Sequence, residues 1–477
     1  MLSNKHQTFS CVLWSAIERF SVQGIQFILS FVIARQLLPT DYGLVAMLTI
    51  FMVIAQIFVE SGFSNALIQK QNRSNADFST VFYFNIGVGI LMYLGLVLSA
   101  PFIASFYNQP ILPEIIEWMG LNLIINSLST VQRTILTIDL DFRRQAFISF
   151  IAVIVSGFIA VYMAMHGYGV WTLVVQSLLT NGINTLLLWI NSKWYPEWIF
   201  SLNSFKNMFS FGSKILLGGL LHNIYTNVYT LVIGKIFPIH ELGLYNRASS
   251  LSQFPSTNIT NILDRVLYPV LCRLQENNNV LSEKFYLFIR IASYIVFPLM
   301  IGLAVLSEPF ICLILTEKWI GAVPYIQILC FAYMWDPVMR MSWNLLNVKY
   351  RSDYSLKSEI IKKITAVTYL LCTIPFGVKA MCWGLVLYAY TDLFIILQFT
   401  KKILPDVTVW NHIKNLLPLL VQSLLMGLGI YLFINIFTNL WFQLIGGVII
   451  GIAIYFLLSM FTSKKELQYI INLVKRK

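Results

Sequence analysis

Long apolar runs separated by short polar segments occupy almost the whole chain. A transmembrane helix needs about 20 mostly apolar residues, and fourteen runs of this kind lie between prolines, glycines and charged residues. They cover residues 10–35, 42–68, 77–105, 114–139, 145–165, 168–191, 206–234, 242–272, 284–306, 322–348, 354–375, 379–400, 411–436 and 438–461. The pattern predicts an all-α polytopic membrane protein with about fourteen transmembrane helices.

The positive charges between these runs predict the orientation in the membrane, because cytoplasmic loops carry an excess of Lys and Arg. An even number of spans places both termini on one side. If that side is the cytoplasm, the four basic residues of the outside segments are Arg35, Lys235, Lys318 and Lys379. The twenty basic residues inside are Lys5, Lys70, Arg73, Arg143, Arg144, Lys193, Lys206, Arg273, Lys284, Lys349, Arg351, Lys357, Lys401, Lys402, Lys414, Lys464, Lys465, Lys475, Arg476 and Lys477. We therefore expect both termini in the cytoplasm.

The composition agrees with a membrane protein and gives little support to an enzyme. The chain is 57% hydrophobic and 11% charged, whereas a soluble protein is about 25% charged. The formal net charge of +12 follows from the inside loops and does not require nucleic acid. The six cysteines and five histidines form no metal-binding spacing, and no nucleotide-binding P-loop is present. We expect no cofactor, no metal and no catalytic residue.

One short sequence occurs twice, 200 residues apart. Residues 32–44 read VIARQLLPTDYGL and residues 232–244 read VIGKIFPIHELGL, so that Gly43 corresponds to Gly243. The copies are six spans apart, so they have the same orientation and are related by an axis along the membrane normal. We predict a lobe of six spans at residues 1–195, a second lobe of six at 196–402, and two further helices with an amphipathic cytoplasmic tail at 403–477. Duplicated lobes are typical of alternating-access transporters.

Five arginines fall deep within the predicted spans. They are Arg19, Arg133, Arg247, Arg265 and Arg340. At about 2.5–3.5 kcal/mol for each residue at the bilayer centre, five lipid-facing arginines would cost roughly 12–17 kcal/mol. We expect a cationic cavity instead, in which guanidinium groups bind the oxygens of an anionic substrate. The alternative is that these arginines pair with carboxylates to join helices.

Four carboxylates within or beside the same spans are candidates for ion coupling: Glu18, Glu60, Asp264 and Asp336. Asp336 precedes Arg340 by four residues, so the two share a helix face and can pair. Amide side chains in the spans suit sugar hydroxyls and equally suit packing between helices. They are Gln23, Gln26, Asn122, Asn126, Gln132, Asn223, Asn227, Asn258 and Asn261.

Several stretches resemble the polysaccharide-transporter family of the multidrug/oligosaccharidyl-lipid/polysaccharide flippase superfamily, in particular its lipopolysaccharide, capsule and exopolysaccharide repeat-unit flippases of the colanic-acid-exporter type. The matching stretches are ARQLLPTDYGL from residue 34, DLDFRRQA from 139, ELGLYNRASSLSQFP from 241, RVLYPVL from 265 and EKW from 317. The YNRA segment, which contains Arg247, is the most specific of them.

This resemblance implies a fold like that of the multidrug and toxic compound extrusion proteins, with two bundles that open alternately to either side. It implies a substrate of oligosaccharide linked through diphosphate to a polyprenol, flipped from the cytoplasmic to the periplasmic leaflet of the bacterial inner membrane. The implied partners are this lipid-linked oligosaccharide, membrane lipids, and the polymerase and glycosyltransferases of the same pathway.

Two other functions compete with a flippase. An ion-coupled multidrug extruder of the same superfamily exports organic cations, and its cavity should be acidic rather than rich in arginine. A membrane-embedded polymerase or ligase needs a sizeable periplasmic loop, and no segment between the predicted spans is long enough. The sequence DLD at 139–141 fits the D-x-D of glycosyltransferases, but carboxylates at helix ends are common.

The charge distribution predicts that cysteines introduced at Ser74 and Ser201 face the cytoplasm. A membrane-impermeant thiol reagent added to intact cells should leave both positions unlabelled, and should label them once the membrane is permeabilised. Ready labelling of either position in intact cells would contradict the assigned orientation.

Overall fold

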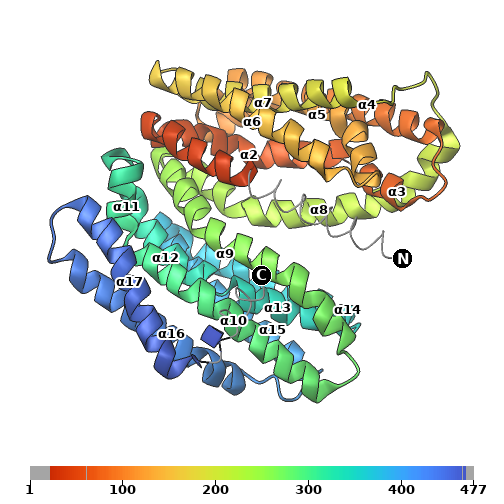
Figure 1. Ribbon diagram of the computed structural model, residues 1–477. Coiled ribbons are helices and arrows are strands. Elements are labelled where there is room, and N and C mark those ends of the chain that lie inside the picture. The colour runs from red at the N-terminus through yellow and green to blue at the C-terminus, as the bar shows by residue number, and fades with distance from the viewer. Residues whose placement is uncertain (1–21, 61, 465, 469–477) are drawn as a thin grey trace. The chain divides into compact units, whose positions relative to one another are not determined.

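The fold is all-α, as predicted. We describe it from a computed structural model, which covers residues 22–60, 62–464 and 466–468 (Figure 1). No strand occurs within these ranges. Eight helical segments of this part of the chain are long and apolar enough to cross a membrane. They are Pro39–Gln69, Asn75–Tyr107, Phe142–Met165, Val170–Asn191, Asn278–Val305, Val378–Lys401, Val409–Ile434 and Leu440–Thr462. The chain is therefore a multi-pass membrane protein, and the full number of fourteen spans stays a prediction.

The chain divides into two compact units, Met1–Gly243 and Leu244–Lys477. This division falls near the start of one helix, whereas the lobes predicted from the repeat meet at 195/196. The lobe boundaries stay a prediction, because a unit defined by packing and a lobe defined by a repeat need not coincide. The predicted amphipathic tail lies largely outside the described residues.

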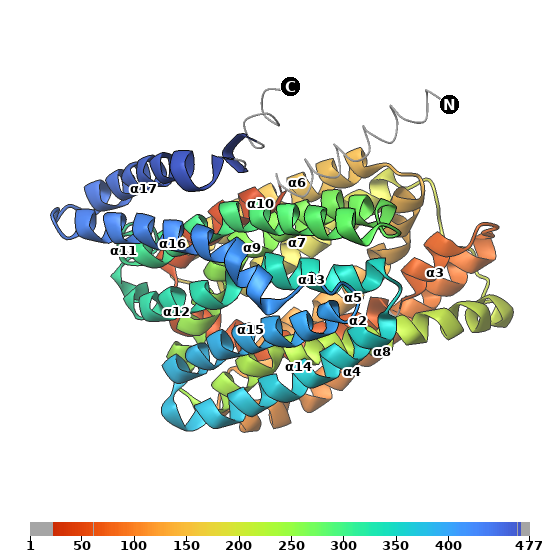
Figure 2. The ribbon, with the colours of Figure 1, turned by 90° about the horizontal axis from the view of Figure 1, so that it is seen from below.

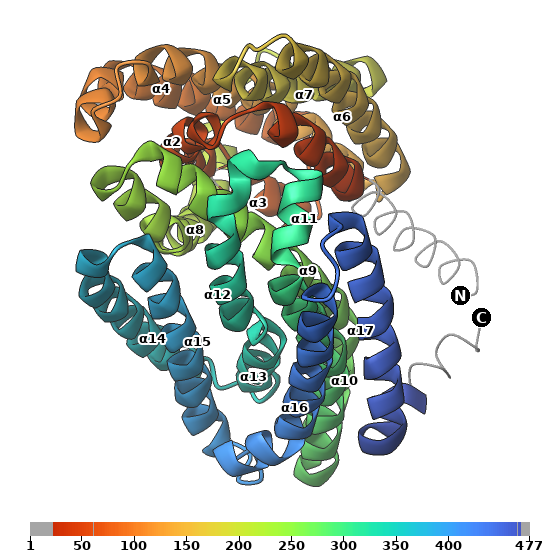
Figure 3. The same cartoon turned by 90° about the vertical axis from the view of Figure 1, so that its left-hand side faces the viewer.

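The first unit begins with a helix over residues 22–36, followed by seven named helices. These are α2 (Pro39–Glu60), α3 (Phe63–Gln69), α4 (Asn75–Tyr107), α5 (Leu112–Ile138), α6 (Phe142–Met165), α7 (Val170–Asn191) and α8 (Leu202–Ile236). Helix α5 packs against both α4 and α7, and α2 packs against α8 (Figure 3). This arrangement places α2, α3, α5 and α8 around a common space.

The second unit consists of the remaining helices. They are α9 (Ile239–Arg273), α10 (Asn278–Val305), α11 (Ser307–Ile314), the 3-10 helix η1 (Glu317–Ala322), α12 (Val323–Tyr333), α13 (Asp336–Val348), α14 (Ser352–Thr373), the 3-10 helix η2 (Ile374–Phe376), α15 (Val378–Lys401), α16 (Val409–Ile434) and α17 (Leu440–Thr462). Helices α14 and α15 form one antiparallel pair and α16 and α17 another (Figure 2). Helix α10 packs against both α12 and α16.

Two of the predicted spans are each formed by two helices, α2 with α3 and α12 with α13. In the span predicted at 42–68, α2 ends at Glu60 and Gly62 adopts φ 68°, a left-handed conformation that glycine tolerates without strain. In the span predicted at 322–348, Pro337 lies in the first turn of a new helix, α13, where its missing N–H costs no helical hydrogen bond. The fragment α3 then buries Phe63 and Leu67 against α4, α5 and α8.

The connection from α3 to α4 shows how local sequence fixes a helix start. Ser74 and Asp77 form a capping box at the N-terminus of α4, in which each side chain bonds the backbone N–H of the other. The Lys70 ammonium lies 2.7 Å from the buried Asp77 carboxylate. These bonds satisfy backbone groups that a helix terminus otherwise leaves unpaired.

The two copies of the repeated turn pack against each other. The helix over residues 22–36 and α8 end 200 residues apart, and α2 and α9 begin 200 residues apart. A side-chain carbon at Gly43 would collide with the backbone of Ile239, and one at Gly243 would collide with the backbone of Pro39. Because Gly43 has no side chain, the start of α9 can approach the backbone of α2, and because Gly243 has none, the start of α2 can approach the backbone of α9. The Lys235 ammonium donates to the Phe106 carbonyl at 2.5 Å, which ties the end of α8 to the last turn of α4.

Substitution of Gly43 or Gly243 by alanine should destabilise the protein, because the added methyl group meets backbone that cannot move aside. We expect a loss of about 1–3 kcal/mol, the usual cost of overpacking, seen as a thermal midpoint several degrees lower for the purified protein in detergent. Gly95→Ala in α4 is the matched control, because nothing lies within 4 Å of the position of its new carbon. A midpoint for Gly243→Ala equal to that of the control would contradict the close contact.

Candidate functional site

A polar cavity of about 610 Å³ lies within the first unit, among α2, α3, α5, α7 and α8. Its lining carries one carboxylate, Glu60, and one guanidinium, Arg133. The other polar residues around it are amides and hydroxyls: Gln56, Ser64, Asn65, Asn126, Ser129, Thr130, Thr134, Thr137, Asn181 and Asn223. Within a chain so rich in apolar residues, a cavity with this lining identifies a place for a polar ligand.

Helix α5 supplies most of this lining because its polar residues recur on one face. Asn126, Thr130, Arg133 and Thr137 are spaced by four, three and four residues, which keeps them in one row along a helix. Thr130, Thr134 and Thr137 each donate to the backbone carbonyl four residues back, so a hydroxyl oxygen such as that of Thr130 retains acceptor capacity toward the cavity. The row was visible in the sequence, but only Asn126 and Arg133 were singled out there.

Arg133 and Glu60, predicted separately as a substrate ligand and an ion-coupling residue, line the same cavity. A short chain of amides leads to the carboxylate. Asn126 donates to Gln56 Oε1 at 3.3 Å, and Gln56 donates to Glu60 Oε1 at 3.1 Å. Gln56 was not among the predicted site residues, although it lies one turn before Glu60 on α2. The arrangement orients the carboxylate and joins α5 to α2.

Other amides of the spans hold helices together, which was the alternative reading of these residues. Asn122 donates to Ser177 Oγ at 3.2 Å and accepts from Asn181 Nδ2 at 2.8 Å. The Trp189 indole N–H adds a bond of 2.9 Å to the Leu128 carbonyl. These bonds fix α7 against α5. They also fix the position of the cavity lining that α5 carries.

In the second unit, Arg340 lies beside a different carboxylate from the one predicted. Its Nε is 3.9 Å from Asp264 Oδ2, and the other oxygen of Asp264 accepts a hydrogen bond from Asn344. Asp336 instead accepts from Ser256 Oγ at 3.1 Å. Among the described residues no ion pair joins Asp336 to Arg340, and the carboxylate nearest to the Arg340 guanidinium is that of Asp264. Two residues of α9 therefore bind these two side chains of α13. The Ser256 hydroxyl donates to the Asp336 carboxylate, and Asp264, two turns farther along α9, lies beside Arg340.

The remaining predicted residues are placed as follows. Arg247 is buried in α9, with 7% of its surface exposed. Arg265 lies in α9, but its side chain is outside the described part of the structure, and so are Glu18 and Arg19. The predicted meeting of Arg19, Arg265 and Arg340 in one cavity therefore stays a prediction.

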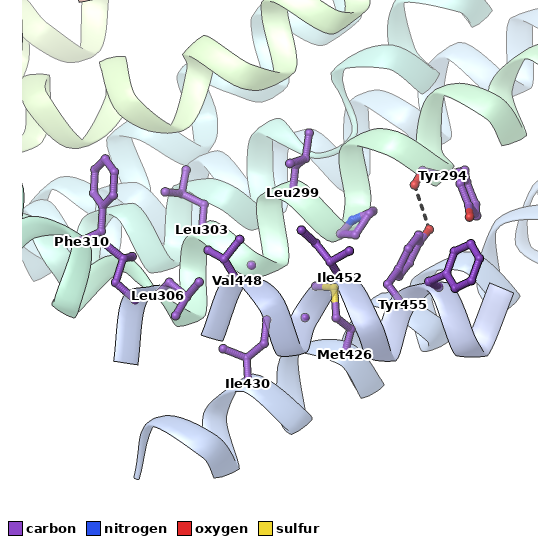
Figure 4. A pocket seen from close by; sticks show the side chains of 15 residues that line it. Tyr294, Leu299, Leu303, Leu306, Phe310, Met426, Ile430, Val448, Ile452 and Tyr455 are labelled. Carbon is purple, nitrogen blue, oxygen red and sulfur yellow. Dashed lines mark hydrogen bonds between the residues drawn. The ribbon is translucent and has the colours of Figure 1, made fainter. Parts of the chain in front are cut away.

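A second cavity, of about 450 Å³, is apolar and lies within the second unit (Figure 4). Side chains of α10 and α11, including Leu299, Leu303 and Phe310, face residues of α16 and α17, including Met426 and Val448. The Tyr455 hydroxyl closes one end by donating to the Tyr294 carbonyl at 2.8 Å. A cavity of this composition accepts a hydrocarbon chain rather than a polar group.

The sequence model of a family described as "Polysaccharide biosynthesis protein" matches residues 32–324, more than half of the chain. The chain belongs to this family. Its relatives include the teichuronic acid biosynthesis protein TuaB of Bacillus subtilis, 29% identical over 356 residues that make up 74% of each chain. The lipopolysaccharide biosynthesis protein WzxC of Escherichia coli is 27% identical over 364 residues, covering 76% of this chain and 74% of the relative.

The fold of this polysaccharide-biosynthesis protein is shared with solved transporter structures. A lipid II flippase, MurJ, in an inward closed conformation matches with a TM-score of 0.73 at 14% identity, over 94% of this chain and 98% of that one. A multidrug-resistance MATE family transporter described as a member of the MOP superfamily, in an inward-facing conformation, matches with a TM-score of 0.62 at 13% identity, over 83% of this chain and 98% of that one. The resemblance read from the sequence and the predicted fold class are confirmed.

A cysteine at Thr130 should react with a small anionic methanethiosulfonate reagent, because this residue lines the polar cavity. Val131 is the matched control, at the same depth on the same helix, since its side chain is fully buried in the core beside Phe63 and Phe82. In a protein whose native cysteines are replaced by serine, we expect modification at 130 at least tenfold faster than at 131. Equal rates would mean that water does not reach the cavity.

Proposed function

We propose that the protein is a flippase that moves polyprenyl-diphosphate-linked oligosaccharide repeat units from the cytoplasmic to the periplasmic leaflet by alternating access. The products would be lipopolysaccharide, capsule or exopolysaccharide. The polar cavity of the first unit, with Arg133 among amides and hydroxyls, carries the proposal. We place the protein in the bacterial inner membrane with both termini in the cytoplasm.

The lining of this cavity suits a diphosphate with sugars attached. A guanidinium binds two phosphate oxygens at once and stays charged at any working pH. Amide and hydroxyl groups donate to and accept from sugar hydroxyls. Most of these contacts are single hydrogen bonds to neutral groups, each worth about 0.5–1.5 kcal/mol. Several moderate contacts hold a substrate and still release it.

Similarity to named proteins supports the same substrate class. TuaB is named for teichuronic acid and WzxC for lipopolysaccharide, and both are cell-envelope polysaccharides. A succinoglycan biosynthesis transport protein, ExoT of Rhizobium meliloti, is 25% identical over 323 residues. We infer that this chain likewise transports a glycan, and that it acts beside the glycosyltransferases that build the repeat unit and the polymerase that joins repeats.

The other predicted arginines belong to the proposal as further phosphate ligands. Arg19, Arg265 and Arg340 would hold the diphosphate while the substrate crosses. Arg133 would act nearer the cytoplasmic mouth and Arg247 nearer the periplasmic mouth. Arg340 lies beside Asp264, and its side chain is 48% exposed, so a phosphate can compete with that carboxylate. The coupling carboxylates in this scheme are Glu60, Asp336, Glu18 and Asp264.

The polyprenyl chain needs an apolar path while its head group crosses. The apolar cavity between α10, α11, α16 and α17 has the required chemistry. Helices α16 and α17 are the two that follow the duplicated lobes in the sequence, so this cavity gives them a role in the proposal.

A multidrug extruder is the competing function. Its cation substrate would need a negative cavity, whereas the lining of the cavity of the first unit contains one carboxylate, Glu60, and one guanidinium, Arg133. The two functions differ in the sign of the charge that the site binds.

Arg133→Ala should reduce export at least tenfold in a strain that lacks its own repeat-unit flippase and relies on this protein. Losing one charge-assisted contact of about 1.5–3 kcal/mol is sufficient for a decrease of that size. Surface polysaccharide should fall and lipid-linked intermediate should accumulate, with a normal amount of protein in the membrane. Arg133→Lys should restore export in part, because lysine keeps the positive charge but cannot bind two phosphate oxygens at once as a guanidinium does. The same result is expected for alanine at Arg19, Arg265 or Arg340.

Arg143→Ala is the control for this experiment, since Arg143 is an exposed arginine at the first turn of α6 and lies outside the cavity lining. Its export should stay within about twofold of wild type. Wild-type export by Arg133→Ala would remove the cavity from the mechanism. Failure of the unsubstituted protein to restore export of any repeat unit would contradict the flippase itself.

A further inference from the structure

A third cavity, of about 510 Å³, lies on the opposite side of α5 from the polar cavity of the first unit. It is formed by one end of α5, the turn into α6, the end of α7 and the segment that follows α7. Gln132, Ile135 and Leu136 of α5 line it, together with Asp139, the residue that caps the C-terminus of α5. Gln132 directly precedes Arg133, and successive residues of a helix point about 100° apart. One helix therefore presents consecutive side chains to two separate cavities.

Gln132 is the unusual residue of this cavity. Its side chain is only 2% exposed, and neither its amide nitrogen nor its oxygen has a hydrogen-bond partner among the described residues. The Trp194 indole N–H on the facing wall is also buried without a partner. A buried polar group is nearly always hydrogen-bonded in a native protein, so each unpaired group requires an explanation. Together they offer two kinds of donor and one acceptor to a molecule in the cavity.

The rim adds groups of mixed character. The Asp139 carboxylate makes no hydrogen bond or ion pair with other described residues. Asp141 is already engaged, because it caps α6 through the Arg144 N–H and its other oxygen lies 3.0 Å from Arg144 Nε. Lys193 and the exposed Tyr195 complete the mouth. The two carboxylates and two cations of the lining balance, so the cavity has no net charge to favour a phosphate.

We propose that this cavity, built on Gln132, Asp139 and Trp194, is a saccharide subsite that binds a sugar of the lipid-linked oligosaccharide. This inference rests on the proposed flippase function and adds to it a second point of contact for the same substrate. A sugar hydroxyl both donates and accepts, so adjacent hydroxyls pair with both ends of the Gln132 amide. Asp139 accepts from a further hydroxyl, the Trp194 N–H donates to one, and the Tyr195 ring covers an apolar C–H face.

The inference separates two parts of the substrate. Arg133 in the first cavity is placed to bind the diphosphate, and Gln132 in the other is placed to bind a sugar. Since both residues are fixed on α5, the distance between the two contacts is set by the helix. A glycan whose sugar cannot reach the subsite while its diphosphate is held would lose this contact.

The experiment compares the binding of two lipids to the purified protein in nanodiscs. One is the lipid-linked oligosaccharide extracted from a flippase-deleted strain whose export the protein restores, and the other is undecaprenyl diphosphate without sugar. For the double variant Gln132→Leu, Asp139→Asn we expect the Kd for the lipid-linked oligosaccharide to rise about tenfold, as the loss of two or three hydrogen bonds implies. The Kd for undecaprenyl diphosphate should change less than twofold. Arg133→Gln should weaken the binding of both.

Controls address folding and the source of the effect. Gln176→Leu makes the same substitution on α7 outside both polar cavities and should leave both Kd values unchanged. Because the Gln132 amide has no protein partner, Gln132→Leu alone should keep the thermal midpoint of wild type or raise it. A marked loss of stability would show that Gln132 is structural and would overturn the subsite, as would an equal rise in both Kd values or no change in either.

A third probe separates this inference from the proposed function. Oligosaccharide released from the same lipid by mild acid is tested for saturation transfer from the protein. Signal with wild type that is lost in the double variant supports the subsite, even if the protein fails to restore export. No signal with wild type, together with unchanged lipid binding in the double variant, overturns the subsite while leaving the flippase function intact.

Discussion

The contact between two helix starts, each allowed by a glycine, organises the first unit. Gly43 and Gly243 carry no side chain, so the beginning of α2 and the beginning of α9 approach to backbone contact. With lipid rather than water around the helices, no hydrophobic effect draws them together, and close van der Waals packing of small residues takes its place. Helix α2 therefore lies against α8, and together with α3 and α5 they surround the polar cavity.

Much of the fold could be read from the sequence because a membrane imposes strict rules. Every backbone group must be bonded within its own helix, so long apolar runs specify helices directly, and even the poorly apolar segment at 242–272 forms one continuous helix, α9. The breaks at Gly62 and between Tyr333 and Asp336 were not predicted. A hydropathy pattern averages over about twenty residues, whereas each break depends on the conformation of one or two. Gly62 also allows Phe63 to turn into the core between α4 and α8.

The site was predicted less completely than the fold, for a different reason. Residues on one helix can be grouped from spacing alone, and the row on α5 from Asn126 to Thr137 was available in this way. The spacing of residues along one helix does not show which other helices that helix packs against. Glu60 and Arg133 line one cavity because α2 packs beside α5, and Arg340 lies beside Asp264 of α9 rather than Asp336 of its own helix. Charged side chains in a membrane protein select partners by helix packing as much as by sequence distance.

Helix α5 is unusual for a helix in a membrane protein, because it lines two polar cavities. On one face it carries the threonines and Arg133 toward the first cavity, on another Gln132 and Leu136 toward the third, and between them Leu123 and Val131 are fully packed. Most of its residues are buried or half-buried, so it can be less apolar than α4 and α6. A helix with polar residues on two faces is costly in a bilayer unless both faces line water or protein. The bonds from Asn181 and Trp189 of α7 hold it in that position.

A transporter that must bind a charged diphosphate and a neutral sugar at once gains from placing both contacts on one such rigid helix, because neither contact can then form without orienting the other.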